Sequence, residues 1–425
     1  MVAEELLHFI WQFRLFNQLE LYSTDDEEIK IQFVGELNRD AGPDFLYARI
    51  SIGGTLWTGH VELHVDGGDW VKHGHHRDAA YNNVILHVVY ENSAPVYRDD
   101  GTCVPCLPLG RLLSVDVILR YKEVMHNLHW IPCERHLASI SAIVKRQMLD
   151  RLAVERLEVQ YARIGASYEE TKGDWERVLF RQLCRSFGMK VNAEAFMQLG
   201  YLVNVSLIRK YCKEPLKIEA LLFGQAGFLA TAQDDYGLYL RTEFSYLRGL
   251  HGLEELTGFT WKFMRMRPAN FPTFRLAQLA SVYAANPYLF EHILNCKNVD
   301  DLFTILAVPA FSSYWACHYR FDQRTAQHEL PLSKDFINHL VINAFVPITF
   351  AYAKKTGLTL LQDRALEWLA TTKAENNAIV RAYRARGCAA TSAADSQALL
   401  QLKRNYCDRK RCLSCMVGHA ILKSS

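Results

Sequence analysis

Two short segments near the start of the chain concentrate side chains that bind metals and transfer protons. Residues 35–45 contain Gly-Pro-Asp-Phe, and in residues 59–66 histidine and carboxylate residues alternate with valine and leucine, which is the period of a β-strand. The polar face of that strand consists of His60, Glu62, His64 and Asp66. Because burying such a row without partners is costly, we expect this face to be exposed to solvent or to hold an ion.

The carboxylates of Asp44 and Glu62 are the first candidate metal ligands. Asp44 begins one expected strand and Glu62 lies on the next. Adjacent strands lie about 4.8 Å apart, so the two carboxylates are close enough to share a cation. Oxygen ligands of this kind suit Mg²⁺ or Mn²⁺, either of which neutralises a phosphodiester during hydrolysis. The pair therefore predicts a metal-dependent phosphodiesterase.

A second polar cluster follows Trp70. Its members are Lys72, His73, His75 and His76. One interpretation is a set of phosphate contacts, a second metal site or a general acid that works near neutral pH. The other interpretation is a polar loop that leads into a helix.

Three cysteines lie close together near the C-terminus. Cys407, Cys412 and Cys415 are separated by four and two residues. A fourth thiolate, from Cys133 or Cys388, would complete a Zn²⁺ or iron–sulfur site. The alternative is a set of unliganded thiols in a basic tail.

The elements that must position these residues can be read from hydrophobic periodicity. Residues 4–19 have the period of an amphipathic helix, and residues 29–34, 45–52, 55–65 and 83–91 have the patterns of strands. Gly53-Gly54 is a turn signal, and a short helix is expected within residues 70–81. The order helix, three strands, helix, strand indicates an α/β module.

The rest of the chain has the period of α-helices. The expected helices are residues 139–165, 174–187, 193–212, 216–232, 273–285, 335–356 and 359–385. We therefore expect an α/β module at 1–112, an all-α basic region at 113–400 and a basic cysteine-containing tail at 401–425.

Charge is divided unevenly along the chain. Residues 1–110 carry seven Lys and Arg against seventeen Asp and Glu, whereas the remainder carries 41 against 29. A basic surface attracts phosphate backbones, so nucleic acid is the expected partner. The sequence has no uninterrupted run of 18 apolar residues and no basic start followed by an apolar run, so we expect a cytoplasmic protein without a membrane span. The oligomeric state is left open.

The N-terminal pattern resembles a known nuclease superfamily. Pro43-Asp44 followed by Glu62-Leu63-His64 is similar to the motif of the PD-(D/E)xK nucleases. The resemblance implies a restriction-endonuclease-like fold, a mixed sheet flanked by helices, that acts on DNA in preference to RNA. It also implies that Asp44 and Glu62 hold the metal. His64 takes the place of the usual lysine.

The same resemblance implies further roles. An upstream acid, Glu5 or Glu36, would assist the metal ligands, and Lys72 could take over the role of the lysine. Some nucleases of this superfamily carry one remote cysteine and three near the C-terminus, which hold an iron–sulfur cluster. The whole chain, with blocks such as Asp40-Ala-Gly-Pro-Asp-Phe45, also resembles an uncharacterised bacterial family of unknown function.

Two alternative functions remain open. The first is a catalytically inactive module that keeps the nuclease-like fold and only binds nucleic acid, because the lysine is replaced. The second is a different metallohydrolase that uses His73, His75 and His76 together with Glu62.

Overall fold

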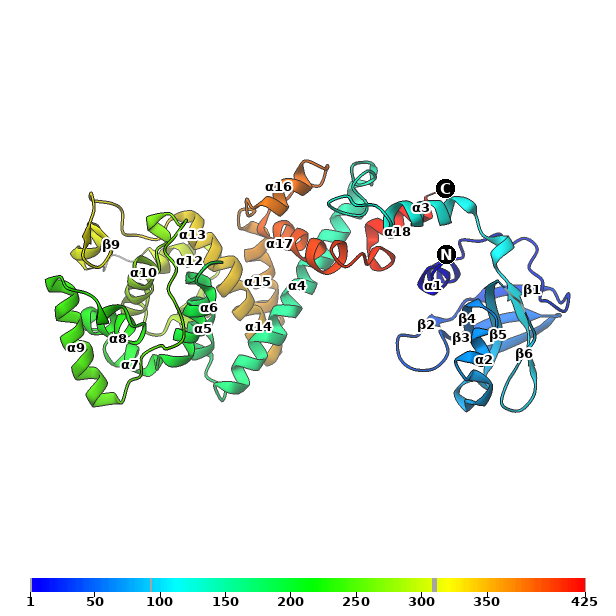
Figure 1. Cartoon of the computed structure of the whole chain (residues 1–425), viewed down its shortest axis with the longest axis horizontal. Helices are drawn as coiled ribbons and strands as arrows, with labels where there is room; N and C mark the ends of the chain where they lie inside the picture. Colours follow the sequence, from blue (N-terminus) through cyan, green and yellow to red (C-terminus); the bar gives the residue numbers. More distant parts are fainter. Residues whose placement is uncertain (1, 92–93, 308–311, 425) are drawn as a thin grey trace. The chain divides into compact units, whose positions relative to one another are not determined.

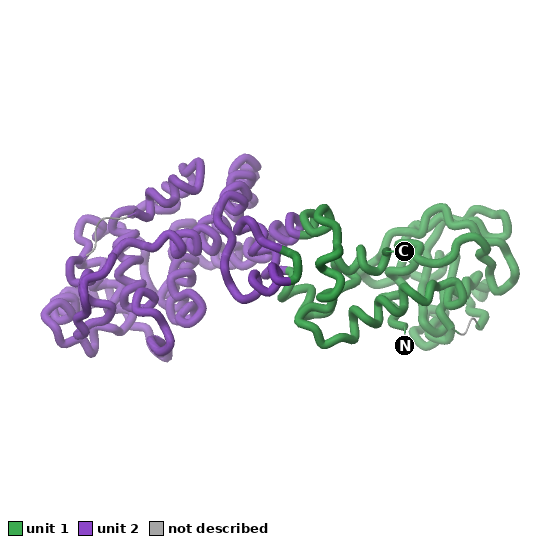
Figure 2. The backbone as a smooth tube through the Cα atoms, turned by 90° about the horizontal axis from the view of Figure 1, so that it is seen from above, with its two compact units in different colours: residues 1–148, 386–388, 402–425 green, residues 149–385, 389–401 purple. Residues whose placement is uncertain are grey.

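The chain forms two compact units in the computed structural model, which describes residues 2–91, 94–307 and 312–424. Unit 1 comprises residues 1–148, 386–388 and 402–425, and unit 2 comprises residues 149–385 and 389–401 (Figure 2). The boundaries of these units differ from the expected ranges 1–112, 113–400 and 401–425. The segment after residue 112 and the C-terminal tail both contribute side chains to the core of the N-terminal sheet, so they belong to unit 1.

Unit 1 is built on a mixed β-sheet (Figure 1). The strand order is β1-β3-β4-β5-β8, and β2 pairs with β3. The first two pairings, β1 with β3 and β3 with β4, are antiparallel, and β4 with β5 and β5 with β8 are parallel. The strands are β1 (Ile29–Phe33), β2 (Glu36–Leu37), β3 (Phe45–Ile52), β4 (Thr55–Asp66), β5 (Val84–Glu91) and β8 (Cys106–Pro108). The predicted mixed sheet is confirmed.

The local sequence explains how the strands meet. The apolar run of β5 is buried from Val84 through Val89, as expected for a strand covered on both faces. Gly53 and Gly54 form the turn between β3 and β4 with φ values of 57° and 83°, which favour glycine. A bulge at Tyr47, with φ of 60°, shifts the β3–β4 register close to the point where Asp44 enters the strand.

Two expected helices of unit 1 are shorter than predicted. Helix α1 (Glu4–Gln12) ends early because the chain turns at Arg14, whose φ is 52°, and Phe16 then pairs with Leu113. The expected helix within residues 70–81 is three short turns, of which the first, α2 (Asp69–Lys72), ends before Gly74. Gly74 has a φ of 84° and breaks the helical path.

The C-terminal tail is a folded part of unit 1. It contains a helical turn at Leu402–Cys407, a second turn at Cys412–Ser414 and helix α18 (Met416–Lys423). Helix α18 packs against α3 (Val115–Met125). Leu422 joins the hydrophobic core that also contains the buried side chains of α1. The tail therefore contributes to the same core as the sheet.

Unit 2 is helical, as predicted, and is held by one large hydrophobic core. Its helices are α4 (Ala142–Glu170, from Leu149 on), α5 (Trp175–Phe187), α6 (Ala193–Leu202), α7 (Val205–Lys210), α8 (Pro215–Gln225), α9 (Asp235–His251), α10 (Pro272–Ala285), α11 (Leu289–Asn295), α12 (Val299–Leu306), α13 (Lys334–Leu340), α14 (Val346–Thr356), α15 (Thr359–Thr371), α16 (Ala378–Arg384) and α17 (Ala393–Gln401). The expected helix 193–212 is two helices, because Val203 is extended and the Asn204 side chain caps a new start.

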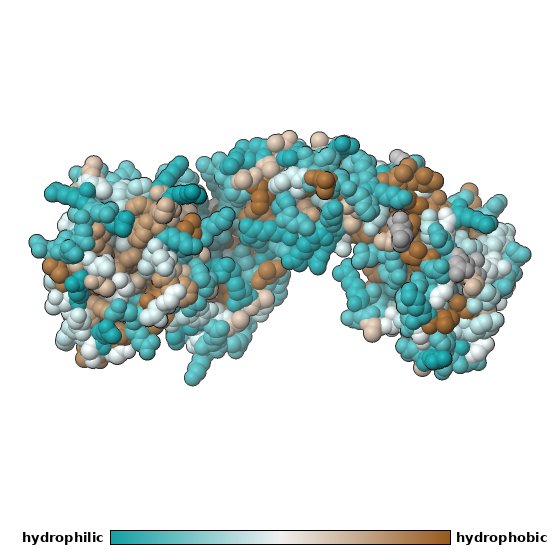
Figure 3. All heavy atoms as spheres, viewed as in Figure 1, coloured by the Kyte–Doolittle hydropathy of each residue, from teal (hydrophilic) through white to brown (hydrophobic). Residues whose placement is uncertain are grey.

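One helical segment, Lys334–Thr356, is long and apolar enough to cross a membrane. However, 78% of its most apolar window is buried inside the protein, which is typical of a core helix. On the face drawn in Figure 3, hydrophilic residues surround the apolar ones in both units.

Candidate metal centre

Asp44 is positioned by the loop that connects β2 and β3. The Asn38 side chain closes this loop by donating a hydrogen bond of 3.0 Å to the carbonyl of Pro43, and the Asn38 backbone N–H donates to the carbonyl of Asp44 at 2.7 Å. Phe45, the next residue, is fully buried and pairs with Val61 of β4. The loop and the strand together fix Asp44 beside β4.

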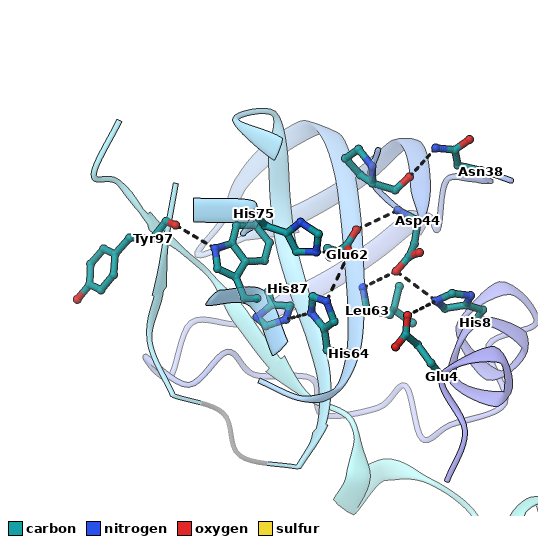
Figure 4. Close-up of polar contacts among 12 residues, drawn as sticks. Glu4, His8, Asn38, Asp44, Glu62, Leu63, His64, His75, His87 and Tyr97 are labelled. Carbon is teal, nitrogen blue, oxygen red and sulfur yellow. Dashed lines mark hydrogen bonds and ion pairs between the residues drawn. The ribbon is translucent and has the colours of Figure 1, made fainter. Parts of the chain in front are cut away.

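Asp44 and Glu62 are joined across the two strands by reciprocal hydrogen bonds (Figure 4). The backbone N–H of Asp44 donates to Glu62 Oε2 at 3.0 Å, and the backbone N–H of Leu63 donates to Asp44 Oδ2 at 2.9 Å. The structure thus brings together the two carboxylates that the sequence pattern paired.

Helix α1 adds two side chains to this pair. His8 Nε2 lies 3.2 Å from Asp44 Oδ2 and 3.9 Å from Glu4 Oε1. One ligand atom from each of Glu4, His8 and Asp44 can be chosen so that all three lie within 4.8 Å of one another. A carboxylate–imidazole–carboxylate group of this size can surround one cation.

The upstream acid is the point at which the sequence interpretation differs from the structure. Glu5 and Glu36 are both exposed, whereas Glu4 is the acid that lies beside Asp44. The sequence interpretation missed Glu4 and His8. Their separation by four residues, which places them on one helix face, was the signal that could have found them.

Three histidines lie on the other side of Glu62. His75 Nε2 and His64 Nε2 are 3.3 and 3.6 Å from Glu62 Oε1, and the nearest ligand atoms of His64, His73 and His75 lie within 4.8 Å of one another. His64 Nδ1 shares a hydrogen bond of 2.9 Å with Nε2 of the fully buried His87, which is therefore a core histidine. Glu62, His64 and His75 are 5%, 1% and 8% exposed, so this arrangement lies inside the protein.

The aromatic residues behind His75 hold its ring in place. Tyr81 stacks on the imidazole with ring centroids 3.8 Å apart, and Trp70 meets it edge-on at 5.5 Å. Trp70 is itself fixed by a hydrogen bond of 3.0 Å from its Nε1 to the carbonyl of Tyr97 (Figure 4). Rigid packing of this kind preorganises a side chain for ligand binding.

Two members of the second polar cluster lie apart from Glu62. The Lys72 side chain is 74% exposed and pairs with Asp69 at 3.0 Å. Among the described residues, His76 does not belong to the group formed by His64, His73 and His75. The loop after Trp70 therefore sends only some of its polar side chains toward the sheet.

The surroundings of Glu62 and Glu4 disfavour their ionised forms. Burial raises the pKa of Glu62, and the negative charge of Asp44 raises it further, although His75 opposes the shift. Burial and Asp44 also raise the pKa of Glu4. A raised pKa means that the surroundings disfavour the ionised carboxylate, and a cation bound beside it would oppose that shift.

The histidines behave in two different ways. Burial and the neighbouring histidines lower the pKa of His64 to about 3, and burial lowers the pKa of His87 to about 4, so both rings are neutral at physiological pH. Burial also acts to lower the pKa of His8, but the hydrogen bond and charge of Asp44 outweigh it and raise that pKa. His8 is therefore the imidazole in this group that most readily carries a proton.

Two buried ring nitrogens, Nε2 of His8 beside Asp44 and Nε2 of His75 beside Glu62, face the carboxylates without a well-aligned hydrogen bond in the described part of the chain. His75 Nε2 has no well-aligned hydrogen bond within the described part of the chain, although Glu62 Oε1 lies 3.3 Å away. A buried polar atom that makes no hydrogen bond carries a cost in stability. A ligand that accepts the lone pair of the His75 nitrogen would remove that cost.

The predicted cysteines meet elsewhere in unit 1. Cys133, Cys407, Cys412 and Cys415 line one small cavity of about 10 Å³. Burial raises the pKa of the Cys133 thiol, and negative charge on the other three cysteines raises it further. Cys388, the alternative fourth ligand, is buried but is not among the residues that line this cavity.

The first unit has a mixed parallel and antiparallel sheet, and histidine and carboxylate side chains gather at one place on it. The second unit is helical. The chain belongs to the family described as "Protein of unknown function (DUF2851)", whose model matches residues 4–378. The comparison with curated proteins finds no match, and the comparison with solved structures finds none either.

Proposed function

We propose that this protein is a metal-dependent phosphodiesterase of the nuclease type, acting in the bacterial cytoplasm on nucleic acid, with DNA favoured over RNA. The observations that carry the proposal are the group of Glu4, His8 and Asp44, whose ligand atoms lie within 4.8 Å of one another, and the hydrogen bond from the Asp44 backbone N–H that holds the Glu62 carboxylate beside Asp44. The order of elements is a helix, four strands of which β2 spans only two residues, a helical segment and a further strand, and apart from β2 it is the order that the PD-(D/E)xK resemblance implies.

The residues present fit a hard divalent cation. Carboxylate oxygens are the preferred ligands of Mg²⁺ and Mn²⁺, and two of these carboxyl groups have raised pKa values that a cation would lower. Glu4, Asp44 and Glu62 would hold the ion. When bound, it would supply electrostatic stabilisation of the charge that develops on a phosphodiester.

The histidines take supporting roles in this proposal. His64, in the place of the usual lysine, is neutral and tied to His87, so it orients Glu62 rather than supplying positive charge. His8 holds a proton at Nε2 beside Asp44 and is the candidate proton donor. In this proposal His8 on α1, and not His64 on β4, supplies the positively charged group that the lysine supplies in the resembling nucleases.

Cleavage assays on the full chain test the proposal. Wild-type protein with Mg²⁺ or Mn²⁺ should cleave single- or double-stranded DNA or RNA, and Asp44→Asn should lower the rate at least about 100-fold. Glu5→Gln and Glu36→Gln are matched controls, because they neutralise exposed carboxylates nearby, and they should leave the rate within about 3-fold. Binding of nucleic acid without cleavage would favour the inactive binding module instead.

A second candidate function rests on a different observation. The three-histidine group of His64, His73 and His75, beside Glu62, has the donor types of a transition-metal hydrolase. In that case Zn²⁺ would support hydrolysis better than Mg²⁺, and His75→Ala would abolish it while Asp44→Asn would not. The two candidates therefore make opposite predictions for the same pair of variants.

A further inference from the structure

We infer that Cys133, Cys407, Cys412 and Cys415 form a second metal centre, with four thiolate ligands, that fastens the C-terminal tail to the rest of unit 1. This centre is independent of the proposed function, because it uses none of the residues around Glu62. Its occupant is a thiophilic metal, either a single zinc-class ion or an iron–sulfur cluster, since both are bound by four cysteine thiolates.

The convergence of the four cysteines is the first observation. Three come from within nine residues of the tail, and the fourth comes from a loop more than 270 residues earlier in the chain. All four are buried and line the same small cavity. Core cysteines that serve only as small apolar side chains have no reason to gather at one point.

Independent contacts hold the two segments together at this place. The Lys403 ammonium and the Arg386 guanidinium lie 5.0 and 4.8 Å from the ring centroid of Trp130, and Arg386 also pairs with Glu134 at 3.1 Å. From the tail, Lys410 Nζ donates a hydrogen bond of 2.7 Å to the carbonyl of Met125. The tail therefore contacts the segment before Cys133 at two points, and Arg386, which precedes the tail, holds the residue that follows Cys133.

Close backbone packing also builds this site. Gly418 of α18 lines the cavity, and a Cβ atom there would lie 2.0 Å from the carbonyl oxygen of Cys412. Only glycine permits this approach, which seats the Cys412–Cys415 turn against the helix. Arg411 also lines the cavity, and its positive charge would offset the net negative charge of a metal bound by four thiolates.

The size of the cavity bears on whether a single metal ion or an iron–sulfur cluster occupies this site. The cavity of about 10 Å³ is close to the volume that one water-sized particle requires, which suits a single ion. Among the described residues, however, no three of the four sulfur atoms lie within 4.8 Å of one another. A single ion would draw the thiols inward through side-chain rotations, whereas a cluster would hold the sulfur atoms farther apart.

Elemental analysis of full-length protein purified without oxygen tests the inference. About one zinc per chain supports a single ion, and iron with a matching amount of acid-labile sulfide supports a cluster. Cys412→Ser and Cys133→Ser should each lose most of the bound metal and lower the melting temperature of unit 1 by about 5 °C. Cys106→Ser is the matched control, because Cys106 is an equally buried thiol of unit 1 on strand β8, and it should keep the metal.

A measurement on the wild-type protein avoids the problem of a variant that does not fold. The four thiols should resist alkylation until a chelator or an oxidant removes the metal, and mass spectrometry should then find all four modified together. Asp44→Asn should leave this metal in place, which separates it from the centre near Glu62. Protein with neither zinc nor iron, or with four thiols that alkylate at once under native conditions, would overturn the inference.

Discussion

Unit 1 of this protein buries Glu62, unit 2 buries Glu176 and Glu219, and the surroundings of Glu62 and Glu219 differ. In unit 2, Glu219 Oε2 accepts hydrogen bonds from Trp315 Nε1 at 2.7 Å and from Tyr236 OH at 2.8 Å. In unit 1, Glu62 faces a second carboxylate and two imidazole nitrogens. Burial raises the pKa of both carboxyl groups.

A raised pKa does not by itself mark a functional site, because Glu219 and Glu62 share it in different surroundings. Glu219 is surrounded by donors that satisfy it, so it serves the packing of the helices. Glu62 is surrounded by further ligand-type atoms, including the unpartnered Nε2 of His75. Acceptor atoms that face one another are stabilised by a cation or by protons shared between them, and this difference is the reason for which we propose the functional site in unit 1.

The largest expected effect separates the two glutamates by activity. Glu62→Gln removes a metal ligand of the proposed phosphodiesterase and should lower kcat/KM at least about 100-fold. Glu219→Gln keeps the shape of its side chain in the other unit and should leave kcat/KM within about 2-fold. Rates measured with saturating Mn²⁺ on one DNA substrate compare them, and equal losses would remove the basis of the distinction.

A stability measurement sharpens the role of Glu219. Glu219→Ala leaves the Trp315 indole and the Tyr236 hydroxyl without their acceptor and opens a cavity, so it should cost unit 2 about 3 kcal/mol. Tyr236→Phe removes a single hydrogen bond and should cost about 1 kcal/mol. Denaturant unfolding monitored by tryptophan fluorescence gives both values, and a neutral Glu219→Ala would show that the buried network contributes nothing.

The two units should respond to pH in opposite directions. The pKa of Glu219 is raised to about 7, so its contribution to stability is full below about pH 4.5 and is lost as the pH rises through 7. Unit 2 should therefore lose about 1.4 kcal/mol per pH unit between pH 5 and 7 from this group. Hydrogen exchange in helix α8 measures the slope, and Glu219→Gln should flatten it.

The histidines of unit 1 should contribute a stability that changes with pH in the opposite direction. The pKa of His64 is lowered to about 3, so its contribution is full above about pH 6.5 and is lost as the pH falls toward 3. Because the raised pKa of Glu62 works against this slope, the measurement belongs in a Glu62→Gln background. The free energy of opening in strands β4 and β5, obtained from exchange rates corrected for the intrinsic effect of pH on exchange, should fall below pH 6, and an opening free energy independent of pH would mean that the buried imidazoles titrate normally.

A smaller effect concerns the loop that positions Asp44. Asn38→Ala removes the hydrogen bond to the Pro43 carbonyl without touching a proposed ligand. We expect metal affinity to fall about 10-fold, as is usual when a supporting contact is lost, while stability changes by about 1 kcal/mol. Asp40→Ala, in the same exposed loop, is the control and should leave the affinity unchanged.

The smallest expected effect concerns Lys72. Because its side chain is exposed and paired with Asp69, Lys72→Ala should leave cleavage within about 2-fold. A loss comparable to that of Glu62→Gln would mean that Lys72 moves into the site and takes the role of the missing lysine.

Much of unit 1 could be predicted from the sequence because its signals are local. The alternation of β4 and the apolar run of β5 define strands, and the spacing of two adjacent strands was enough to bring Asp44 close to Glu62. Similarly, the spacing of Cys407, Cys412 and Cys415 indicated a fourth partner, and Cys133 was one of two candidates.

What the sequence could not supply depends on long-range packing. The position of α1 over the sheet decides that Glu4 and His8, rather than Glu5 or Glu36, lie beside Asp44, and no local pattern encodes that docking. The early end of α1 depends on the pairing of Phe16 with Leu113, almost 100 residues later. The sequence also suggested that the tail is a separate segment, because its basic residues are clustered in the sequence. The packing of Leu422 into the core of unit 1 is a long-range contact, which no local pattern shows.

Calorimetric titration of Mn²⁺ into metal-stripped protein tests the central claim most directly. We expect that the wild type binds Mn²⁺ with release of protons and that this release grows as the pH falls, since burial raises the pKa values of the carboxyl groups of Glu4 and Glu62. We also expect that Asp44→Asn with Glu62→Gln abolishes this binding, whereas Glu5→Gln with Glu36→Gln preserves it. Equal Mn²⁺ affinity in the wild type and the Asp44→Asn, Glu62→Gln double variant would contradict the account.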